Sequence, residues 1–373
     1  NAEFVKTNNA YLSPWLTTIL IGSYMIVGTF EVSNLGGTLS LGAFLATINV
    51  FKEIGMELNE IYLESMEIQK AFGPLRKLSF FMNLPTDLET RMKVNRARRE
   101  LGKKRREEAR EARKLSNAMN EDGLIMTDKG DVSFAVDTLK IEIVNLTFKY
   151  EGREPVLENM SVAFPQGKLY AFVGPPHRGK ATMLRLLGQV LIPQPESGSV
   201  FVPPHLRVLH VSREAFILND SFRKNIIFNQ ELSKIGGIER VARICQRVGF
   251  SDHMLGLLQE DDRLAQNSGE ATSSKAWAAG FSASDFGRLN LARALVMNPE
   301  CLVLHMPFQH FSDAEANTMV ETVKAHVEER GIELALSDRK YRRPRTVFFS
   351  SPGMSRSFHA DVVYEMTADR SMR

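Results

Sequence analysis

Residues 169–187, with the sequence LYAFVGPPHRGKATMLRLL, constrain the fold more than any other part of the chain. A β-prone apolar run enters a turn bounded by glycine and proline, and an apolar stretch at helical spacing follows the turn. Gly174 and Gly179-Lys180 bracket four residues, which is the pattern of a loop that binds phosphate at a helix amino terminus. There, free backbone N–H groups and the helix dipole hold phosphate oxygens, and the lysine reaches the outer phosphates.

One position of this loop differs from the full pattern. A serine or threonine directly after the lysine binds Mg²⁺ through its hydroxyl group. Residue 181 is alanine instead, and Thr182 follows it. The sequence therefore predicts a phosphate-binding loop that lacks one metal ligand.

The first 88 residues predict a partial transmembrane domain. Residues 11–30 carry no charge, and twenty residues are enough to cross a bilayer as a helix. A second span is expected over residues 34–54, although its uncharged part is short. From residue 52 to residue 77, apolar positions continue beside glutamates, which predicts an amphipathic helix that leaves the membrane.

Residues 89–136 are expected to be a charged linker. Residues 89–114 contain twelve Lys and Arg and five Glu, a composition typical of solvated helices or disordered linkers. Because the loop of residues 31–38 has no basic residue, we expect the chain after residue 51 to lie in the cytoplasm, in contact with membrane lipid. The net charge of +3 gives no reason to expect a nucleic-acid partner.

Residues 137–373 have the pattern of an α/β domain. Strands are expected over residues 140–150 and 156–164, as an antiparallel pair, and over residues 198–202, 206–211, 301–304 and 345–350; helices are expected over residues 235–248, 288–296 and 318–329. Strands that alternate with helices around a phosphate loop predict a mostly parallel, covered sheet. The two cysteines and eight histidines lack the spacing of metal ligands, so no metal site is expected.

In this order the motifs resemble the carboxy-terminal part of an ATP-binding cassette (ABC) transporter of the exporter type. The resemblance implies a P-loop NTPase cassette with a mostly parallel sheet, an antiparallel β subdomain and a helical subdomain. An α-helical transmembrane hairpin and a charged linker helix would precede this cassette. Because the chain starts with Asn and contains only two spans, we expect it to be a piece of a longer polypeptide.

The resemblance also implies which residues would hold a nucleotide. Tyr150 stands where the family places the aromatic residue that stacks on adenine. The phosphate loop supplies the other candidates, which are Gly174, Gly179, Lys180, Ala181 and Thr182. Together these residues predict weak ATP binding, with Mg²⁺ absent.

The departures from the family's motifs point away from catalysis. Arg213 replaces the family's glutamine that touches Mg²⁺ and water, His305 replaces the acid that supports the metal, and Met306 replaces the general base. Ser312 replaces the acid of the next loop, and Pro352 replaces the switch histidine. In the signature motif, which contains Ser282, Ala283 and Ser284, the two glycines are replaced by Ala283 and Ser284. A thioether cannot accept the proton that a general base takes. Since phosphoryl transfer depends on metal and cations, no residue is assigned a catalytic role.

Three functions are compatible with this pattern. The first is a degenerate half or fragment of an ABC transporter, which couples the ATP-driven motion of a second ABC half or cassette, in a homodimer or heterodimer, to membrane helices. The alternative is a non-transport pseudo-ATPase that serves as a scaffold or regulatory interaction module. An ordinary active ATPase is the third. The membrane hairpin and the long amphipathic extension favour the first.

Overall fold

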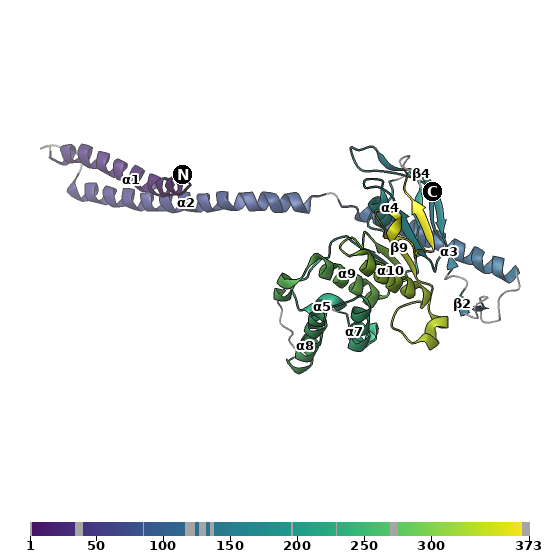
Figure 1. The fold of residues 1–373 in the computed structure, drawn as a ribbon. Helices are drawn as coiled ribbons and strands as arrows, with labels where there is room; N and C mark the ends of the chain where they lie inside the picture. Colours follow the sequence, from purple (N-terminus) through teal and green to yellow (C-terminus); the bar gives the residue numbers. More distant parts are fainter. Residues whose placement is uncertain are drawn as a thin grey trace. The chain divides into compact units, whose positions relative to one another are not determined.

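The computed structural model describes residues 2–33, 40–84, 86–115, 124–126, 132–134, 138–194, 197–228, 230–268 and 275–367. The chain divides into two compact units, Asn1–Asp87 and Leu88–Arg373 (Figure 1). The described part of the first unit is helical, whereas the second unit contains the strands, which form three sheets, and most of the buried core.

The first unit is a hairpin of two helices, α1 (Ala2–Ser33) and α2 (Leu41–Met82), which lie side by side (Figure 1). Glycines allow the helices to approach closely. A Cβ atom on Gly28 would lie 2.3 Å from the Phe44 ring, and one on Gly55 would lie 2.2 Å from a side chain of α1. Small residues at such contacts are typical of helices that pack within a membrane.

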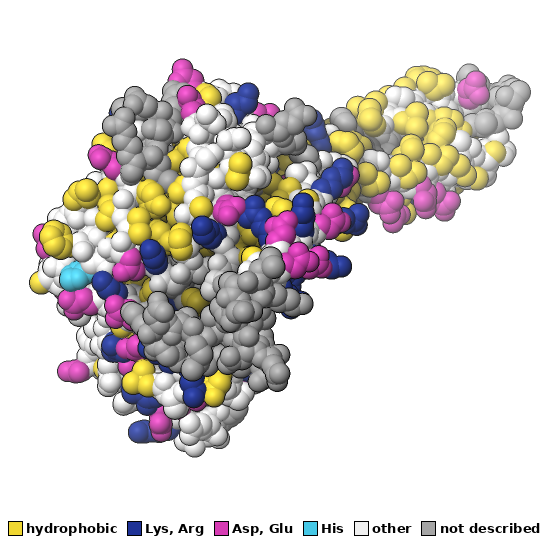
Figure 2. Space-filling model, turned by 90° about the vertical axis from the view of Figure 1, so that its right-hand side faces the viewer, with side chains coloured by type: hydrophobic (Ala, Val, Ile, Leu, Met, Phe, Trp, Pro, Cys, Tyr) yellow, Lys and Arg dark blue, Asp and Glu magenta, His cyan; other side chains and the backbone are white. Residues whose placement is uncertain are grey.

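One segment of this hairpin, Pro14–Ser33, is long and apolar enough to cross a membrane, with a mean hydropathy of 1.4. In the described part of the chain no second helix meets this criterion. Residues 34–39 of the second predicted span lie outside the described residues, and α2 begins at Leu41. Hydrophobic side chains cover most of the hairpin surface, with a row of acidic side chains along one side (Figure 2).

The second unit is built on two sheets, as the sequence predicted. Five parallel strands form one sheet in the order β10-β5-β9-β8-β7, and three antiparallel strands form the other in the order β4-β3-β6. The strands are β3 (Ile141–Lys149), β4 (Pro155–Phe164), β5 (Leu169–Val173), β6 (Ser199–Phe201), β7 (Val208–Val211), β8 (Cys301–Leu304), β9 (Thr346–Ser350) and β10 (Val362–Glu365). A separate pair, β1 (Leu124–Met126) and β2 (Val132–Phe134), is antiparallel.

Strand β5 lies at the centre of the core. Its side chains alternate between the two faces of the sheet, as in any strand. Leu169, Ala171 and Val173 join a cluster with the helices, whereas Tyr170 and Phe172 join a cluster with the antiparallel sheet and α4. All five side chains are buried, so the loop that follows β5 extends from a fixed support.

The second unit also contains helices, some of which pack against the parallel sheet. They are α3 (Leu88–Leu115), α4 (Lys180–Leu187), α5 (Phe222–Ile227), α6 (Leu232–Ile235), α7 (Gly237–Arg247), α8 (Asp252–Ser268), α9 (Ala283–Met297) and α10 (Asp313–Glu328), with short 3₁₀ turns at Ala276–Gly280, Leu336–Tyr341 and Met354–Arg356. The prediction of a single helix over residues 235–248 is wrong, because the structure has two helices there, α6 and α7. Gly236 adopts a left-handed conformation with φ of 86° and separates α6 from α7.

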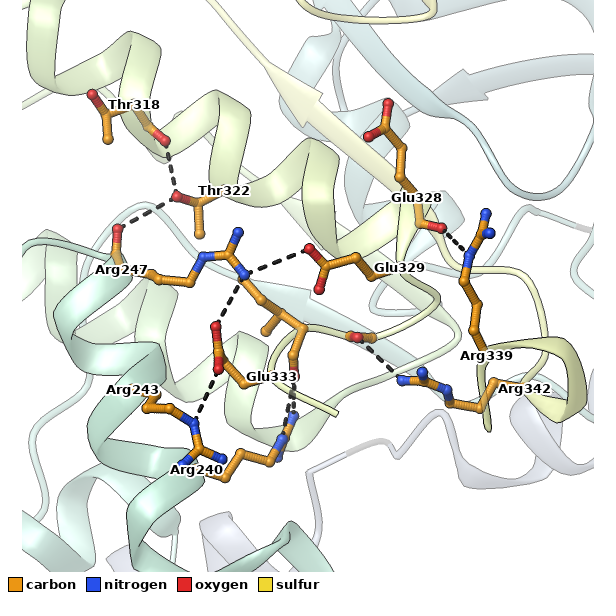
Figure 3. A network of polar contacts seen from close by, with 12 residues as sticks. Arg240, Arg243, Arg247, Thr318, Thr322, Glu328, Glu329, Glu333, Arg339 and Arg342 are labelled. Atoms are coloured by element: carbon orange, nitrogen blue, oxygen red, sulfur yellow. Dashed lines mark hydrogen bonds and ion pairs between the residues drawn. The ribbon is translucent and has the colours of Figure 1, made fainter. Parts of the chain in front are cut away.

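A polar network holds α7 against the chain that follows α10 (Figure 3). Glu333 accepts hydrogen bonds from Arg243 and Arg247, each at 3.0 Å. Arg240 is buried and donates to the backbone oxygens of Ile235, at 2.6 Å, and Ile332, at 3.2 Å. Burial lowers the pKa of Arg240 to about 10, which leaves it charged at neutral pH. Backbone carbonyls therefore satisfy a buried cation where no carboxylate pairs with it directly.

Candidate functional site

The predicted phosphate loop connects β5 to α4 and depends on two glycines. Gly174 has φ of 134° and Gly179 has φ of 83°. A Cβ atom on Gly174 would lie 2.8 Å from the backbone oxygen of Met366, and one on Gly179 would lie 2.8 Å from Cδ2 of Leu157. Both the backbone conformation and the close packing therefore require glycine at the two ends of the loop.

The loop between these glycines has few backbone donors. Pro175 and Pro176 carry no N–H group. His177 is a non-glycine residue with φ of 62°. The first turn of α4 still provides N–H groups, since its N-cap residue, Gly179, makes no side-chain capping bond. Donors for an anion thus remain at the helix end, and within the loop His177 and Arg178 each keep one backbone N–H.

Lys180 is directed back toward the loop. Its Nζ atom donates to the backbone oxygens of Gly174 and Pro175, the latter at 2.6 Å, and its side chain is buried. Burial lowers the pKa of Lys180. A phosphate that displaced these two carbonyls would meet a desolvated ammonium group, which strengthens their electrostatic attraction.

Two further predicted residues meet beside this loop. The hydroxyl groups of Tyr150 and Thr182 are 3.1 Å apart and share a hydrogen bond. The Tyr150 ring also packs edge-on against Phe148, with ring centroids 5.2 Å apart. Ala181, between Lys180 and Thr182, offers a methyl group where a metal-binding hydroxyl would stand.

His305 and Met306 directly follow β8, and Ser350 ends the neighbouring strand β9. These residues therefore lie at the same edge of the parallel sheet. The His305 backbone N–H donates to Val211 O at 3.0 Å. Nδ1 of His305 lies 3.1 Å from Oγ of Ser350, and that oxygen also accepts the Met306 N–H at 2.9 Å. Met306 has φ of 48°, and its thioether offers no proton acceptor for a water molecule.

The charges around His305 are positive. Burial, as the largest cause, and the charges of Arg185, His210, Arg213 and Lys180 together lower the pKa of His305 to about 4. Burial also lowers the pKa of His210, so both imidazoles are neutral at neutral pH and the permanent charges are those of Lys180, Arg185 and Arg213. We call these three cations and the two histidines the cationic cluster. Arg185 lies on α4, His210 on β7, and Arg213 two residues beyond β7.

A divalent cation does not fit this cluster. Mg²⁺ is bound by carboxylate and hydroxyl oxygens in near-octahedral geometry. Among the described residues, no group of three or more His, Cys, Asp or Glu could hold a metal ion. Histidine, alanine and arginine occupy the positions where the family resemblance expects metal ligands. The cluster suits an anion that carries no metal.

The predicted signature segment forms the amino end of α9. Ser282 is the N-cap, and its Oγ atom accepts the Asp285 N–H at 3.2 Å, while the Ser282 N–H donates to the Asp285 carboxylate at 3.0 Å. The Ser284 hydroxyl lies 2.9 Å from that of Ser282, and Ala283 is the first residue of the helix. The chain's own side chains thus satisfy this helix end.

Asp285 adds a negative charge to this end of α9. Burial raises its pKa, but hydrogen bonds from Ser282 and the charge of Arg288 lower it by more, so its pKa lies below the usual value. Arg288 bonds Asp285 at 3.2 Å and also Glu315, in the first turn of α10. Ser312, the N-cap of α10, donates to Glu315 at 2.7 Å. The predicted motif residues Ser282 and Ser312 therefore cap helices.

Pro352 and Arg213 occupy exposed positions. Pro352 follows β9, where the neighbouring Ser351 donates its N–H to Phe172 O at 3.0 Å and its hydroxyl to Gly353 O at 2.8 Å. The proline side chain has no polar atom to offer a phosphate. The structure thus places the two predicted motif positions in loops at the carboxyl ends of the parallel strands.

Sequence reasoning missed four polar residues of these regions, which are Arg185, His210, Arg288 and Ser350. Arg288 had a detectable signal, because it follows Asp285 by three residues on a predicted helix. Ser350 ends β9, the strand beside β5, a position that favours ligand contact in parallel sheets. His210 is the last residue but one of β7, and it packs against Gly188 at the carboxyl end of α4. Arg185 lies within an apolar helical pattern and gave no signal of its own.

Comparisons with known proteins agree with this architecture. The chain is 28% identical over 200 residues to the ABC-type transmembrane transporter verA of Clonostachys rogersoniana, a match that covers 51% of this chain and 15% of verA. It is 30% identical over 188 residues to the leukotoxin translocation ATP-binding protein LktB of Mannheimia haemolytica, covering 47% of this chain and 23% of LktB. A comparison with models of protein families found no match.

The fold is that of an ABC exporter. A solved bacterial Atm1-family ABC exporter with ATP bound aligns with 96% of this chain and 53% of its own chain, with a TM-score of 0.57 and 14% sequence identity. The chain therefore fits a fragment of an ABC exporter, as the order of motifs predicted. It spans less than a quarter of the length of these two curated relatives.

Proposed function

We propose that this chain is a degenerate half, or part of a half, of an ABC-type membrane transporter, whose cassette binds a nucleotide without hydrolysing it. One observation carries this proposal. His305 follows β8 at the edge of the sheet where a metal and a general base would act, and the charges that act on it are those of Lys180, Arg185 and Arg213, with no carboxylate of the described residues among them.

The missing groups argue against hydrolysis. Loss of a general base alone lowers the rate by about 10²–10⁴-fold. In this chain Met306 replaces the base, and Ala181, His305 and Arg213 replace groups that would hold the metal or position water. Effects within one catalytic unit are not additive, but here the base, the metal ligands and the water-positioning group are replaced together, and the remaining cations cannot accept a proton from water.

Binding without a metal follows from the same charges. A nucleoside triphosphate that reaches the free N–H groups of α4 would be neutralised by Lys180, Arg185 and Arg213 in place of Mg²⁺. Tyr150 and Thr182 first exchange their shared hydrogen bond for contacts with the nucleotide. The affinity is therefore weak, and Mg²⁺ competes with the cluster for the phosphates.

The membrane part gives the cassette its place in the cell. Pro14–Ser33 crosses the membrane in this proposal, and the basic residues of α3 keep the cassette in the cytoplasm, next to lipid. Since two helices cannot enclose a pathway, a second ABC half or cassette and further membrane helices complete the transporter. ATP-driven motion of that partner then moves the membrane helices of this chain.

The structure of the signature segment favours a second candidate, the non-transport scaffold. The end of α9 would face a partner's nucleotide in an ABC dimer, and here Asp285 places a carboxylate there. A cassette that neither hydrolyses ATP nor completes a partner's site could serve as an interaction module. Extending the reading frame upstream distinguishes the two, because further membrane spans support the transporter and an unrelated soluble region supports the scaffold.

Turnover of Mg²⁺-ATP by the full chain in lipid nanodiscs tests the proposed inactivity. We expect the rate to equal that of the Lys180→Ala variant, since neither protein has a catalytic base. Turnover in the unmodified chain that Lys180→Ala abolishes would overturn the assignment and identify an active ATPase.

A further inference from the structure

Helix α3 carries arginines at every seventh position, Arg91, Arg98 and Arg105, which we call the arginine series. Seven residues make almost two helical turns, so the three side chains lie along one face of the helix. All three contact the body of the cassette. The exposed residues Arg96 and Arg99 of the same helix lie on other faces.

The first two arginines bind the chain directly after α4. Arg91 donates to the backbone oxygens of Gln189, at 3.2 Å, and Val190, at 3.0 Å. Arg98 donates to the Gln189 side-chain oxygen at 2.6 Å. Gln189 has φ of 59°, and the Val190 N–H bonds back to the Arg185 backbone oxygen at 2.8 Å. Arg91 and Arg98 thus hold the turn that closes the carboxyl end of α4.

The third arginine fixes α3 further along. Arg105 donates to Glu142 of β3 at 2.6 Å, and its guanidinium lies 4.3 Å from the centroid of the Phe201 ring. Gly102 approaches Pro204 so closely that a Cβ atom would lie 2.8 Å from Cδ of the proline. Contact at three levels makes α3 an ordered part of the cassette rather than a free linker.

Helix α4 lies between the phosphate loop at its amino end and the contacts with α3 at its carboxyl end. The amino end of α4 carries Gly179 and Lys180 of the phosphate loop, and α4 is only eight residues long. A shift of its amino end is therefore felt at its carboxyl end, where Arg91 and Arg98 attach. Helix α3 begins at Leu88, and only residues 83–87 separate it from α2.

We infer that α3 transmits the position of the phosphate-loop helix toward the membrane helices through the arginine series. This inference rests on the proposed function only in treating α1 and α2 as membrane helices of a transporter. Gly102 packs against Pro204, but among the described residues no α3 side chain belongs to either buried hydrophobic cluster, so the main polar attachments of α3 are the arginines. Their removal is therefore expected to release α3 and leave the cassette folded.

Hydrogen–deuterium exchange of the full chain in phosphatidylcholine nanodiscs tests this inference. In the Arg91→Ala/Arg98→Ala variant we expect exchange over residues 88–105 to rise about tenfold or more. The matched control Arg96→Ala/Arg99→Ala removes two arginines from the exposed face and should change exchange less than about twofold. Equal exchange in both variants would show that the arginine series does not hold α3.

Transmission is tested by disturbing the amino end of α4 with Gly179→Ala, or with the milder Ala181→Gly if that variant does not fold. We expect exchange over residues 88–105 to change about threefold when the arginine series is intact and to stay constant in the Arg91→Ala/Arg98→Ala background. A response that persists in that background, or altered α4 exchange without any response in α3, would overturn the inference. This test disturbs α4 by substitution and uses no nucleotide. A failure of the chain to bind ATP would therefore contradict the proposed nucleotide site and would not bear on this inference.

Discussion

The Nδ1 atom of His305 lies 3.1 Å from the Oγ atom of Ser350, across the carboxyl ends of two neighbouring parallel strands. Burial, together with positive charges that include Arg185 and Lys180, lowers the pKa of His305 to about 4, so its imidazole is neutral at neutral pH. The local field therefore repels a divalent cation and attracts phosphate. The predictions below follow from this arrangement and from the capping and glycine positions around it.

Replacing His305 with aspartate should restore a response to Mg²⁺. A single carboxylate among Lys180, Arg185 and Arg213 changes the interaction with a nearby cation by about 1 kcal/mol or more. We expect Mg²⁺ to strengthen ATP binding roughly fivefold in His305→Asp, as measured by calorimetry. The control His310→Asp places the same charge at an exposed site five residues further on. An equal gain in both variants would assign the effect to net charge alone.

Acid should destabilise the chain through its buried histidines. Burial, as the largest cause, and the charges of Arg345 and Arg240 together lower the pKa of His326 to about 3. The unfolded chain binds a proton near pH 6.5, so stability is full above that pH and is lost as the pH falls toward 3. Each such histidine contributes at most about 1.4 kcal/mol per pH unit within this window.

Chemical denaturation at several pH values measures this loss. His326→Gln should flatten the dependence of the unfolding free energy on pH between 6.5 and 4. His310→Gln removes an exposed histidine and should leave the dependence unchanged. A slope that is the same in His326→Gln and in the unmodified chain would contradict the assignment of His326.

Two glycines should respond to alanine in opposite directions. At Gly179, φ of 83° and the contact with Leu157 make alanine destabilising by about 1–3 kcal/mol. At Gly256, inside α8, a Cβ atom would meet nothing within 4 Å, so alanine should stabilise by about 0.5–1 kcal/mol. Urea titration followed by Trp277 fluorescence measures the free energy of unfolding of the cassette, provided that every variant also carries Trp15→Phe. A higher unfolding free energy in Gly179→Ala would contradict the strained conformation of the loop.

Ser282 should matter for stability because it caps α9. Ser282→Ala removes the side chain that accepts the Asp285 N–H and is expected to destabilise the cassette by about 1 kcal/mol. Ser284→Ala is the matched control, since Ser284 lies one residue inside the helix and its hydroxyl bonds to the Ser282 hydroxyl, not to the backbone N–H that Ser282 caps. Equal effects of the two substitutions would place the stabilising role elsewhere.

The sequence predicted the parts of the fold that depend on local patterns. The antiparallel pair β3–β4 and the parallel strands β8 and β9 follow from alternation and apolar runs, and the structure confirms them. The phosphate-binding role of the loop after β5 stays a prediction. Helices α9 and α10 begin five residues earlier than predicted, because Ser282 and Ser312 form capping boxes with Asp285 and Glu315. That Ser-x-x-acid pattern was present in the sequence as a start signal.

Contacts between distant residues could not be read in the same way. Arg98 and Gln189 are 91 positions apart, and His305 and Ser350 are 45 apart. The charge of residues 89–114 indicated solvation, yet an arginine at every seventh position turns toward the cassette, a period that is visible only when the contacting face is known. Likewise the cationic cluster joins α4, β7 and β8, which the sheet order brings together.

The most direct test of the central claim is calorimetric titration of ATP into the full chain in nanodiscs, once with Mg²⁺ and once with a chelator. The cationic cluster predicts weak binding that Mg²⁺ leaves unchanged or reduces, and that Tyr150→Ala weakens while the exposed control Tyr341→Ala does not. Binding that becomes tighter when Mg²⁺ is added would contradict the account, since it requires metal ligands in a site where the structure places histidine, alanine and arginine.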